Sequence, residues 1–186
     1  FWHHFENAGA PIHSGNDLWI NMNPFTPGLN RVEADELSYG LHIMIRTDLE
    51  IDLLENDLPV EDLPTEWNKR YLDLLGVTPT TDTEGCLQDV HWSEGMFGYF
   101  PSYLLGHLIS AQLTNTLEKD LGNIENIIES QQISTILDWL RRNVHHYGRS
   151  LDSEGLVKTV SGTELTPKYF LEYLNNKVEK LSTISE

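Results

Sequence analysis

The chain has 186 residues, with 29 Asp and Glu against 12 Lys and Arg, so its formal net charge is −17. Binding to nucleic acid or to an anionic membrane surface depends on basic residues that neutralise phosphates, and a charge this negative argues against both partners. Hydrophobic residues make up 39% of the chain, which is enough to form a core and argues against disorder. The composition therefore predicts a folded acidic protein that binds neither nucleic acid nor membranes.

The first residues and the cysteine content bear on cellular location. No run of about eighteen apolar residues occurs, and the start of the chain lacks the basic and apolar stretches of a signal peptide. Cys86 is the single cysteine and no Asn-x-Ser/Thr site occurs, which favours a reducing cytoplasm. The first residue is not Met but Phe1, so we expect the chain to be the C-terminal part of a longer protein.

The beginning of the chain is predicted to be irregular. Residues 1–6 are rich in aromatic residues and resemble the end of a preceding helix. Residues 7–30 contain repeated Pro, Gly and Asn, and no helical or strand period survives in them. We therefore expect a loop-rich lead-in over residues 1–30 and a helical domain over residues 31–186.

The first half of the predicted domain contains two helices and a connection. From Arg31 to about Glu55 apolar residues recur at spacings of three and four, which predicts one long helix. A shorter helix is expected at 62–75, with Gly76 as its stop signal. A polar connection follows, and residues 85–92 are expected to form a brief strand or an extended turn.

The second half is predicted to be entirely helical. Residues 101–117 are apolar nearly all round, as in a buried helix, and are expected to form the core. Further helices are predicted at 123–129, 133–147, 152–160 and 167–181, from apolar spacing together with capping and stop signals. The fold class is therefore all-α, with at most a small β element in the connection before these helices.

The densest group of chemically active side chains lies at residues 85–103, where amide, carboxyl, imidazole, phenol and indole groups surround three glycines. Such groups are either structural hydrogen-bond partners or a site, and composition favours neither. The His-Glu-x-x-His pattern of zinc peptidases is absent. The adjacent pairs His3–His4 and His145–His146 diverge by about 100° on a helix, and we interpret them as surface or capping residues.

Two short motifs resemble those of a known family. Residues 85–92 match the signature Gly-x-x-Gln-Asp-x-His-Trp, and residues 31–35 match Ile-Arg-x-x-Ala-Asp except that Asn30 stands where the family usually has Ile. The motifs occur in the family's order, with similar flanks at 34–43, 60–68, 97–106 and 148–173. On these residues the chain from about Arg31 to its end resembles the carboxypeptidase Taq family of zinc metallocarboxypeptidases.

The resemblance implies an all-helical cytoplasmic enzyme, usually a homodimer, that removes amino acids one at a time from peptide C-termini. The family's His-Glu-x-x-His helix and its downstream glutamate ligand precede the matched region. We therefore expect the missing N-terminal portion to supply zinc, or another divalent metal, and the general base. This chain alone is expected to bind no catalytic metal and to be inactive. The alternative is a non-catalytic helical scaffold or interaction domain derived from that fold.

Arg31 is the candidate clamp for the terminal carboxylate of a substrate, because a guanidinium holds a carboxylate through two coplanar hydrogen bonds and the motif match supports this role. The structural alternative is that Arg31 pairs with Asp35, four residues further along the chain. If Arg31 is the clamp, Asp35 is expected to position groups of the site without contacting the substrate. Gln88 and Arg149 are further candidates for substrate binding. A solvated cation at a helix end is the simpler interpretation of Arg149.

His91 and Tyr99 are the candidate donors to the oxyanion of the tetrahedral intermediate, with Tyr103 behind them. Each such donor contributes roughly 3 kcal/mol of transition-state stabilisation. The resemblance supports Tyr99, since related helical zinc peptidases place the tyrosine of a Gly-Tyr segment in this role. The structural alternative is that both tyrosines are half-buried aromatics whose hydroxyls bond locally. Asp89, together with Gln88, is expected to hold the loop and to orient His91.

Overall fold

The structure is a computed structural model that describes residues 14–185, so the helix end expected at residues 1–6 lies outside it. Contacts divide the chain into two compact units. The first unit comprises the residues up to Leu104 together with those from Glu179 onward, and the second comprises Leu105–Val178. The predicted domain boundary at residue 30 stays a prediction.

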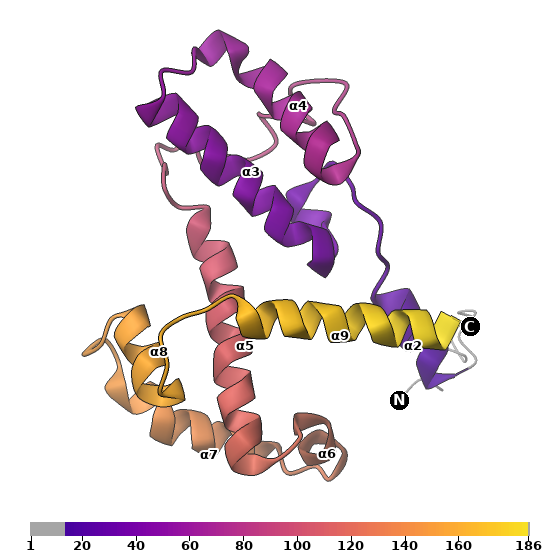
Figure 1. The fold of residues 1–186 in the computed structure, drawn as a ribbon, viewed down its shortest axis with the longest axis vertical. Helices are drawn as coiled ribbons and strands as arrows, with labels where there is room; N and C mark the ends of the chain where they lie inside the picture. The colour runs from indigo at the N-terminus through magenta and orange to yellow at the C-terminus, as the bar shows by residue number, and fades with distance from the viewer. Residues whose placement is uncertain (1–13, 186) are drawn as a thin grey trace. The chain divides into compact units, whose positions relative to one another are not determined.

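The first unit is built around the helices α3 and α4, which follow one another along the chain and pack against each other (Figure 1). Its elements are the helices α2 (Gly15–Met22), α3 (Glu36–Glu55) and α4 (Leu63–Leu75) and the 3₁₀ turns η1 (Arg31–Glu33) and η2 (Val60–Asp62). The start of α5 (Pro101–Leu121) and the end of α9 (Lys168–Ser185) also belong to it.

Two boundaries in this unit differ from the prediction. Residues 15–22 form α2, so the prediction of an irregular lead-in was wrong there: Ser14 caps this helix by accepting from the Asp17 N–H. The long helix begins at Glu36 and not at Arg31, because the Asp35 carboxylate accepts from the N–H groups of the first helical turn. Arg31 lies in η1 instead.

The core of the first unit lies between α3 and α4. Trp67 stacks on Tyr71 with ring centroids 4.9 Å apart. The buried cluster consists of Ile45, Leu49, Leu63, Trp67, Tyr71, Leu75 and Cys86. The stop signal predicted at Gly76 is confirmed, since its φ of 72° is a left-handed conformation that glycine adopts without strain.

The second unit confirms most of the predicted helices. Its elements are α5 (Pro101–Leu121, of which Pro101–Leu104 belong to the first unit), α6 (Ile124–Glu129), α7 (Ile133–Asn143), the 3₁₀ turn η3 (His145–Tyr147), α8 (Ser153–Ser161) and α9 (Lys168–Ser185). Asn123 and Asp152 cap α6 and α8 with their side chains. The helix predicted over 133–147 breaks at Val144, and its last turn is η3.

The expectation that the helix beginning at Pro101 forms the core was wrong. In α5 only Gln112 and Leu117 are buried, and Leu105 is 43% exposed. An apolar composition favours burial of a helix, but the helix is buried only where another element packs against it. Within the residues that the structure describes, the cover of the first unit's core comes from α3 and α4 instead.

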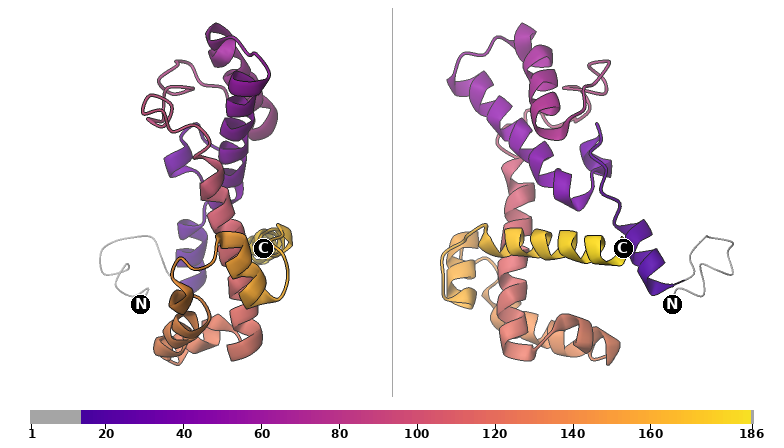
Figure 2. Two further views of the ribbon diagram at one scale, coloured as in Figure 1. Left: turned by 90° about the vertical axis from the view of Figure 1, so that its left-hand side faces the viewer. Right: turned by 45° about the vertical axis from the view of Figure 1, so that its right-hand side comes forward.

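The connection between α4 and α5 consists of turns, drawn as an irregular trace in Figure 2. The Gly85 N–H donates to the Thr81 carbonyl at 3.0 Å, and the Leu87 N–H to the Asp82 carbonyl at 2.8 Å. Residues 14–185 contain no strand, so the extended-turn option for residues 85–92 is the correct one and the all-α class is confirmed. Over the same residues, no helix has the length and apolar character needed to cross a membrane.

Candidate functional site

A row of polar side chains runs along the buried face of α3. Ser38, His42, Arg46 and Glu50 follow one another at intervals of four residues, and none is more than 4% exposed. Residues four apart lie on the same face of a helix. Because buried polar groups need partners, this row requires polar groups on the segments that cover it. The connection between α4 and α5 supplies them.

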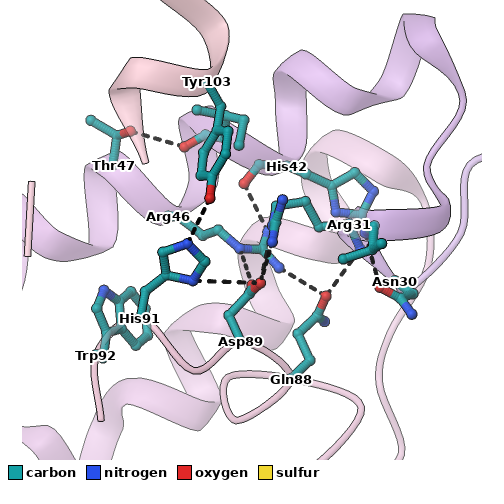
Figure 3. Close-up of polar contacts among 12 residues, drawn as sticks. Asn30, Arg31, His42, Arg46, Thr47, Gln88, Asp89, His91, Trp92 and Tyr103 are labelled. Atoms are coloured by element: carbon teal, nitrogen blue, oxygen red, sulfur yellow. Dashed lines mark hydrogen bonds and ion pairs between the residues drawn. The ribbon is translucent and has the colours of Figure 1, made fainter. Parts of the chain in front are cut away.

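Asp89 lies between two guanidinium groups, as Figure 3 shows. Arg31 donates to its Oδ1 from Nη2 at 2.6 Å and from Nε at 3.0 Å. Arg46 donates from Nε to Oδ2 at 2.6 Å. Both guanidinium groups are buried, and the Asp89 side chain is 10% exposed. This charged cluster, defined as Arg31, Arg46 and Asp89, holds two positive charges against one negative charge.

Burial and ion pairing shift the pKa values of Asp89 and Arg31 in opposite directions. Burial by itself raises the pKa of Asp89, but the hydrogen bonds and charges of the two arginines outweigh it and hold the pKa below the usual range. Burial lowers the pKa of Arg31, and the Asp89 carboxylate more than offsets this. Arg31 and Asp89 are therefore ionised at neutral pH, and since an arginine side chain keeps its charge in proteins, the cluster has an excess positive charge.

Gln88 holds the cluster and its loop together. Its Oε1 accepts from the Arg31 backbone N–H at 3.0 Å and from Arg46 Nη2 at 2.8 Å. Its Nε2 donates to the carbonyl oxygens of Leu29 at 3.0 Å and Glu84 at 2.8 Å. This geometry supports the loop-holding role expected for Gln88. Direct contact with a substrate stays a prediction.

The expected alternative partner of Arg31 was wrong. Asp35 caps α3, and its carboxylate accepts from backbone and side-chain groups of Leu37 and Ser38. Arg31 instead pairs with Asp89, reaches Tyr39 Oη at 3.5 Å and lies over the Tyr103 ring at 5.2 Å. A local pairing four residues along the chain was therefore displaced by a partner 58 residues away.

The two candidate oxyanion donors, His91 and Tyr99, lie together with Tyr103. His91 Nε2 is 3.0 Å from Tyr103 Oη, and its ring packs on Phe100 with centroids 4.3 Å apart. The Tyr99 ring lies 5.8 Å from that of His91, and this residue is 44% exposed. His91 Nδ1 is buried, has no hydrogen-bond partner among the described residues, and is 3.9 Å from Asp89 Oδ1. The site thus keeps an unsatisfied polar atom next to the charged cluster.

Arg149 is an exposed residue of the second unit, in the turns that follow η3. Its contribution to substrate binding stays a prediction. His145 and His146 are also exposed, as expected for surface or capping histidines. His3 and His4 lie outside the described residues.

Sequence reasoning missed His42, Arg46 and Tyr71. His42 Nδ1 is 3.0 Å from Tyr71 Oη, and Arg46 Nη1 donates to that hydroxyl at 3.1 Å and to the His42 carbonyl at 2.8 Å. The Tyr71 hydroxyl therefore links Arg46 to His42: it accepts from Arg46 and shares a hydrogen bond with His42 Nδ1, whose donor depends on the imidazole tautomer. Burial, followed by the Arg46 charge, lowers the pKa of His42 to about 4. The spacing of four among polar residues was the available signal.

Comparison with known proteins identifies the family. The family model for carboxypeptidase Taq (M32) metallopeptidases matches residues 2–178. The chain belongs to this family. Carboxypeptidase 1 of Bacillus subtilis is 45% identical over 166 residues, which cover 89% of this chain and 33% of the relative. Thermostable carboxypeptidase 1 of Thermus thermophilus is 38% identical over 187 residues, with coverages of 97% and 37%.

A solved structure agrees with this assignment. The crystal structure of the M32 carboxypeptidase from Deinococcus radiodurans matches with a TM-score of 0.90 at 33% identity, covering 97% of this chain and 36% of that one. The resemblance inferred from the two motifs is therefore confirmed. The chain spans about a third of the length of the relatives it matches.

Members of the family are metallopeptidases, which implies a divalent metal in the complete enzyme. The residues described here do not fit that metal: no group of three or more His, Cys, Asp or Glu side chains within residues 14–185 is arranged to hold one. The metal of the complete enzyme is therefore not assigned to the described residues of this chain.

Proposed function

We propose that this chain is the C-terminal part of a metal-dependent carboxypeptidase and supplies the binding site for the terminal carboxylate of a peptide. The observation that carries the proposal is the excess positive charge of the buried cluster of Arg31, Arg46 and Asp89. A charge held away from water is costly unless an opposite charge compensates it. A second carboxylate, brought by the substrate, provides that compensation.

The two arginines differ in their remaining hydrogen-bonding capacity. Arg46 spreads its bonds from all three nitrogens over Asp89, Gln88, Tyr71 and the His42 carbonyl. Arg31 uses Nε and Nη2 for Asp89 and reaches Tyr39 from Nη1. A guanidinium carries five N–H groups, so each terminal nitrogen of Arg31 retains one. Arg31 is therefore the carboxylate clamp, and Arg46 holds Asp89 in place.

The neighbouring aromatic residues suit the oxyanion role. Tyr103 is held by His91 through its hydroxyl, whereas Tyr99 is partly exposed and available to a substrate. We assign donation to the oxyanion to Tyr99 and His91, with Tyr103 orienting the imidazole. Residues outside this chain would bind zinc or another divalent metal and act as the general base. The isolated chain is accordingly expected to be inactive.

The clamp is tested by comparing peptides with free and amidated C-termini. In the full-length protein, Arg31→Ala should lower kcat/KM for a free-carboxyl peptide by about 10- to 100-fold, the range expected for hydrogen bonds to a charged group. Residual activity on the amidated peptide should not change. Arg31→Lys keeps the charge without the planar fork and should rescue only part of the loss.

Arg70→Ala is the matched control, because Arg70 pairs with Asp52 outside the charged cluster and should leave both substrates unaffected. Equal losses on the two peptides after Arg31→Ala would contradict the clamp. Assays of the isolated chain test whether the metal and the general base lie outside it. Stoichiometric metal binding or peptide hydrolysis by this chain alone would overturn that assignment. A full-length protein that lacks His-Glu-x-x-His and is inactive would favour the scaffold alternative.

We further propose that the protein acts in the cytoplasm and forms a homodimer. Burial, with the nearby Asp82 charge, raises the pKa of the single cysteine, Cys86, which keeps it an unreactive thiol. Several large apolar side chains are exposed in the first unit, including Leu54, Leu87 and Val90 at 63 to 68%. Surfaces of this kind associate with other protein surfaces. Sedimentation of the full-length protein measures this expectation.

A further inference from the structure

Glu50 is the last member of the polar row on α3 and is only 4% exposed. Its two carboxylate oxygens have separate partners. Oε1 accepts from the Trp92 indole Nε1 at 2.8 Å, and Oε2 accepts from the Gly98 backbone N–H at 3.0 Å. Among residues 14–185 these neutral N–H groups are its hydrogen-bond partners, so the Glu50 carboxyl group is buried here without an ion pair.

The partners of Glu50 lie at the two ends of one loop. His91 directly precedes Trp92, and Tyr99 directly follows Gly98. Local backbone bonds shape the loop, for example from the Met96 N–H to the His91 carbonyl at 2.8 Å. The bonds to Glu50 are different in kind, because they attach both ends of the loop to α3. The same helix carries Arg46 of the charged cluster.

Both contacts use the Glu50 side chain as a hydrogen-bond acceptor. Both partners are donors, and a carboxylate is the side-chain group that offers two acceptor oxygens and no hydrogen. A glutamine at this position would turn an NH₂ group toward one of the two N–H donors and lose that bond. The φ of Gly98, 75°, is a conformation that favours glycine and directs its N–H to Glu50.

We propose that Glu50 is a positioning residue that holds His91 and Tyr99 in register with the carboxylate clamp. This inference rests on the proposed function. Loss of one attachment frees one end of the loop, so the groups that act on the transition state lose their alignment while the clamp on α3 and η1 remains. Removal of the carboxylate therefore affects kcat far more than KM.

Glu50→Gln in the full-length protein tests both halves of this statement. Hydrogen exchange at the Gly98 amide or at the Trp92 indole N–H should become at least about tenfold faster, while amides in the middle of α3 keep their protection. For a free-carboxyl peptide, kcat should fall by about 10- to 100-fold with KM changed by less than about twofold. Glu55→Gln, the same change at an exposed position of α3, should alter neither quantity.

Glu50→Asp provides the second variant, because it keeps two acceptor oxygens on a shorter stem. It should recover part of the kcat lost in Glu50→Gln, and it keeps the proposal testable if the glutamine variant does not fold. Unchanged exchange at both the Gly98 amide and the Trp92 indole N–H, equal kcat for the two variants, or a rise in KM that matches the fall in kcat would overturn the positioning role. Failure of the proposed function would look different, since Arg31→Ala would then not discriminate between free and amidated peptides while one of these two N–H groups still responded to Glu50→Gln.

Discussion

Each unit has a largely buried polar side chain that joins several segments, Gln112 in the second unit and Asp89 in the first. The two sites differ in net charge and in how many of their hydrogen-bonding groups have partners. In the second unit Gln112 is fully buried, and its Nε2 donates to Ser161 Oγ at 2.9 Å and to the Glu164 carbonyl at 3.0 Å. Its Oε1 accepts from the Thr166 N–H at 3.1 Å. In the first unit Asp89 joins two arginines, and the excess charge and the unpaired His91 Nδ1 remain.

The two buried sites differ in whether any hydrogen-bonding group remains available to a ligand. Gln112 is neutral and its donors and acceptor are all occupied, so it ties α5 to the segment between α8 and α9 and has nothing left for a ligand. The charged cluster keeps a positive charge and free N–H groups. Burial of a polar residue is therefore weak evidence of a site, whereas net charge together with unused hydrogen-bonding capacity is stronger evidence.

The largest expected effect is at Asp89. Asp89→Asn keeps the shape of the side chain but leaves two buried guanidinium groups without a counter-charge, which should lower the free energy of unfolding by about 3–5 kcal/mol. Urea denaturation at neutral pH measures this loss. Asp138→Asn, in the exposed pair with Arg141, is the control and should have no measurable effect. A loss no larger than that of the control would show that the charged cluster does not depend on its carboxylate.

The next effect is a pH dependence set by His42. The pKa of His42 is about 4 in the folded protein against the ordinary 6.5 of a histidine, so the unfolded chain takes up a proton first as the pH falls. Stability from this group is fully present above pH 6.5 and falls by about 3 kcal/mol as the pH approaches 4. The contribution of Asp89, whose folded pKa is depressed, is lost only below the unfolded value of about 3.9.

Denaturation midpoints between pH 4 and 7 check this window. His42→Asn retains an acceptor for the Tyr71 hydroxyl and should flatten the dependence, whereas the exposed His146→Asn should leave it as it is. A wild-type protein whose stability does not change between pH 6.5 and 4, or an unaltered slope in His42→Asn, would contradict the assignment.

The smallest of the three effects is at Gln112, and it tests the other side of the comparison. Gln112→Met has similar length but leaves the Thr166 N–H and the Glu164 carbonyl without this partner, which should cost about 1–3 kcal/mol of unfolding free energy. The kcat/KM of the folded full-length protein should not change. Lys158→Met removes an exposed ion pair to the Glu164 side chain and serves as the control. A selective loss of kcat/KM in Gln112→Met would give Gln112 a functional role.

Signals confined to a few neighbouring residues were predicted well from the sequence. The cap at Asp152 and the stop at Gly76 depend on bonds to the adjacent turn, and the structure confirms both. The helix at residues 15–22 was missed, since Gly, Asn and Pro around it outweighed the capping serine at Ser14. The burial of α5 was wrong because burial depends on which elements pack together, and composition does not contain that information.

The site shows the same division. Residues 85–103 were identified as its densest part, and His91, Tyr99 and Tyr103 do gather there. The pairing of Arg31 with Asp35, which was the alternative to the clamp, was wrong. Arg46 and Glu50 were not predicted, because only the apolar spacing of residues 31–55 entered the prediction of that helix. Arg46 pairs with Asp89, 43 residues along the chain, and Glu50 pairs with Trp92, 42 residues along, and no local pattern specifies such separations.

By itself, the sequence determined the family, the helical class and the local caps, since motifs, periodicity and hydrogen bonds to the next turn are all written within short windows. The tertiary structure decided which charges meet: it placed Asp89 between two arginines and set Glu50 against both ends of the loop that carries His91 and Tyr99. The physical reason is that a buried charge is stable only beside partners that folding brings from distant segments.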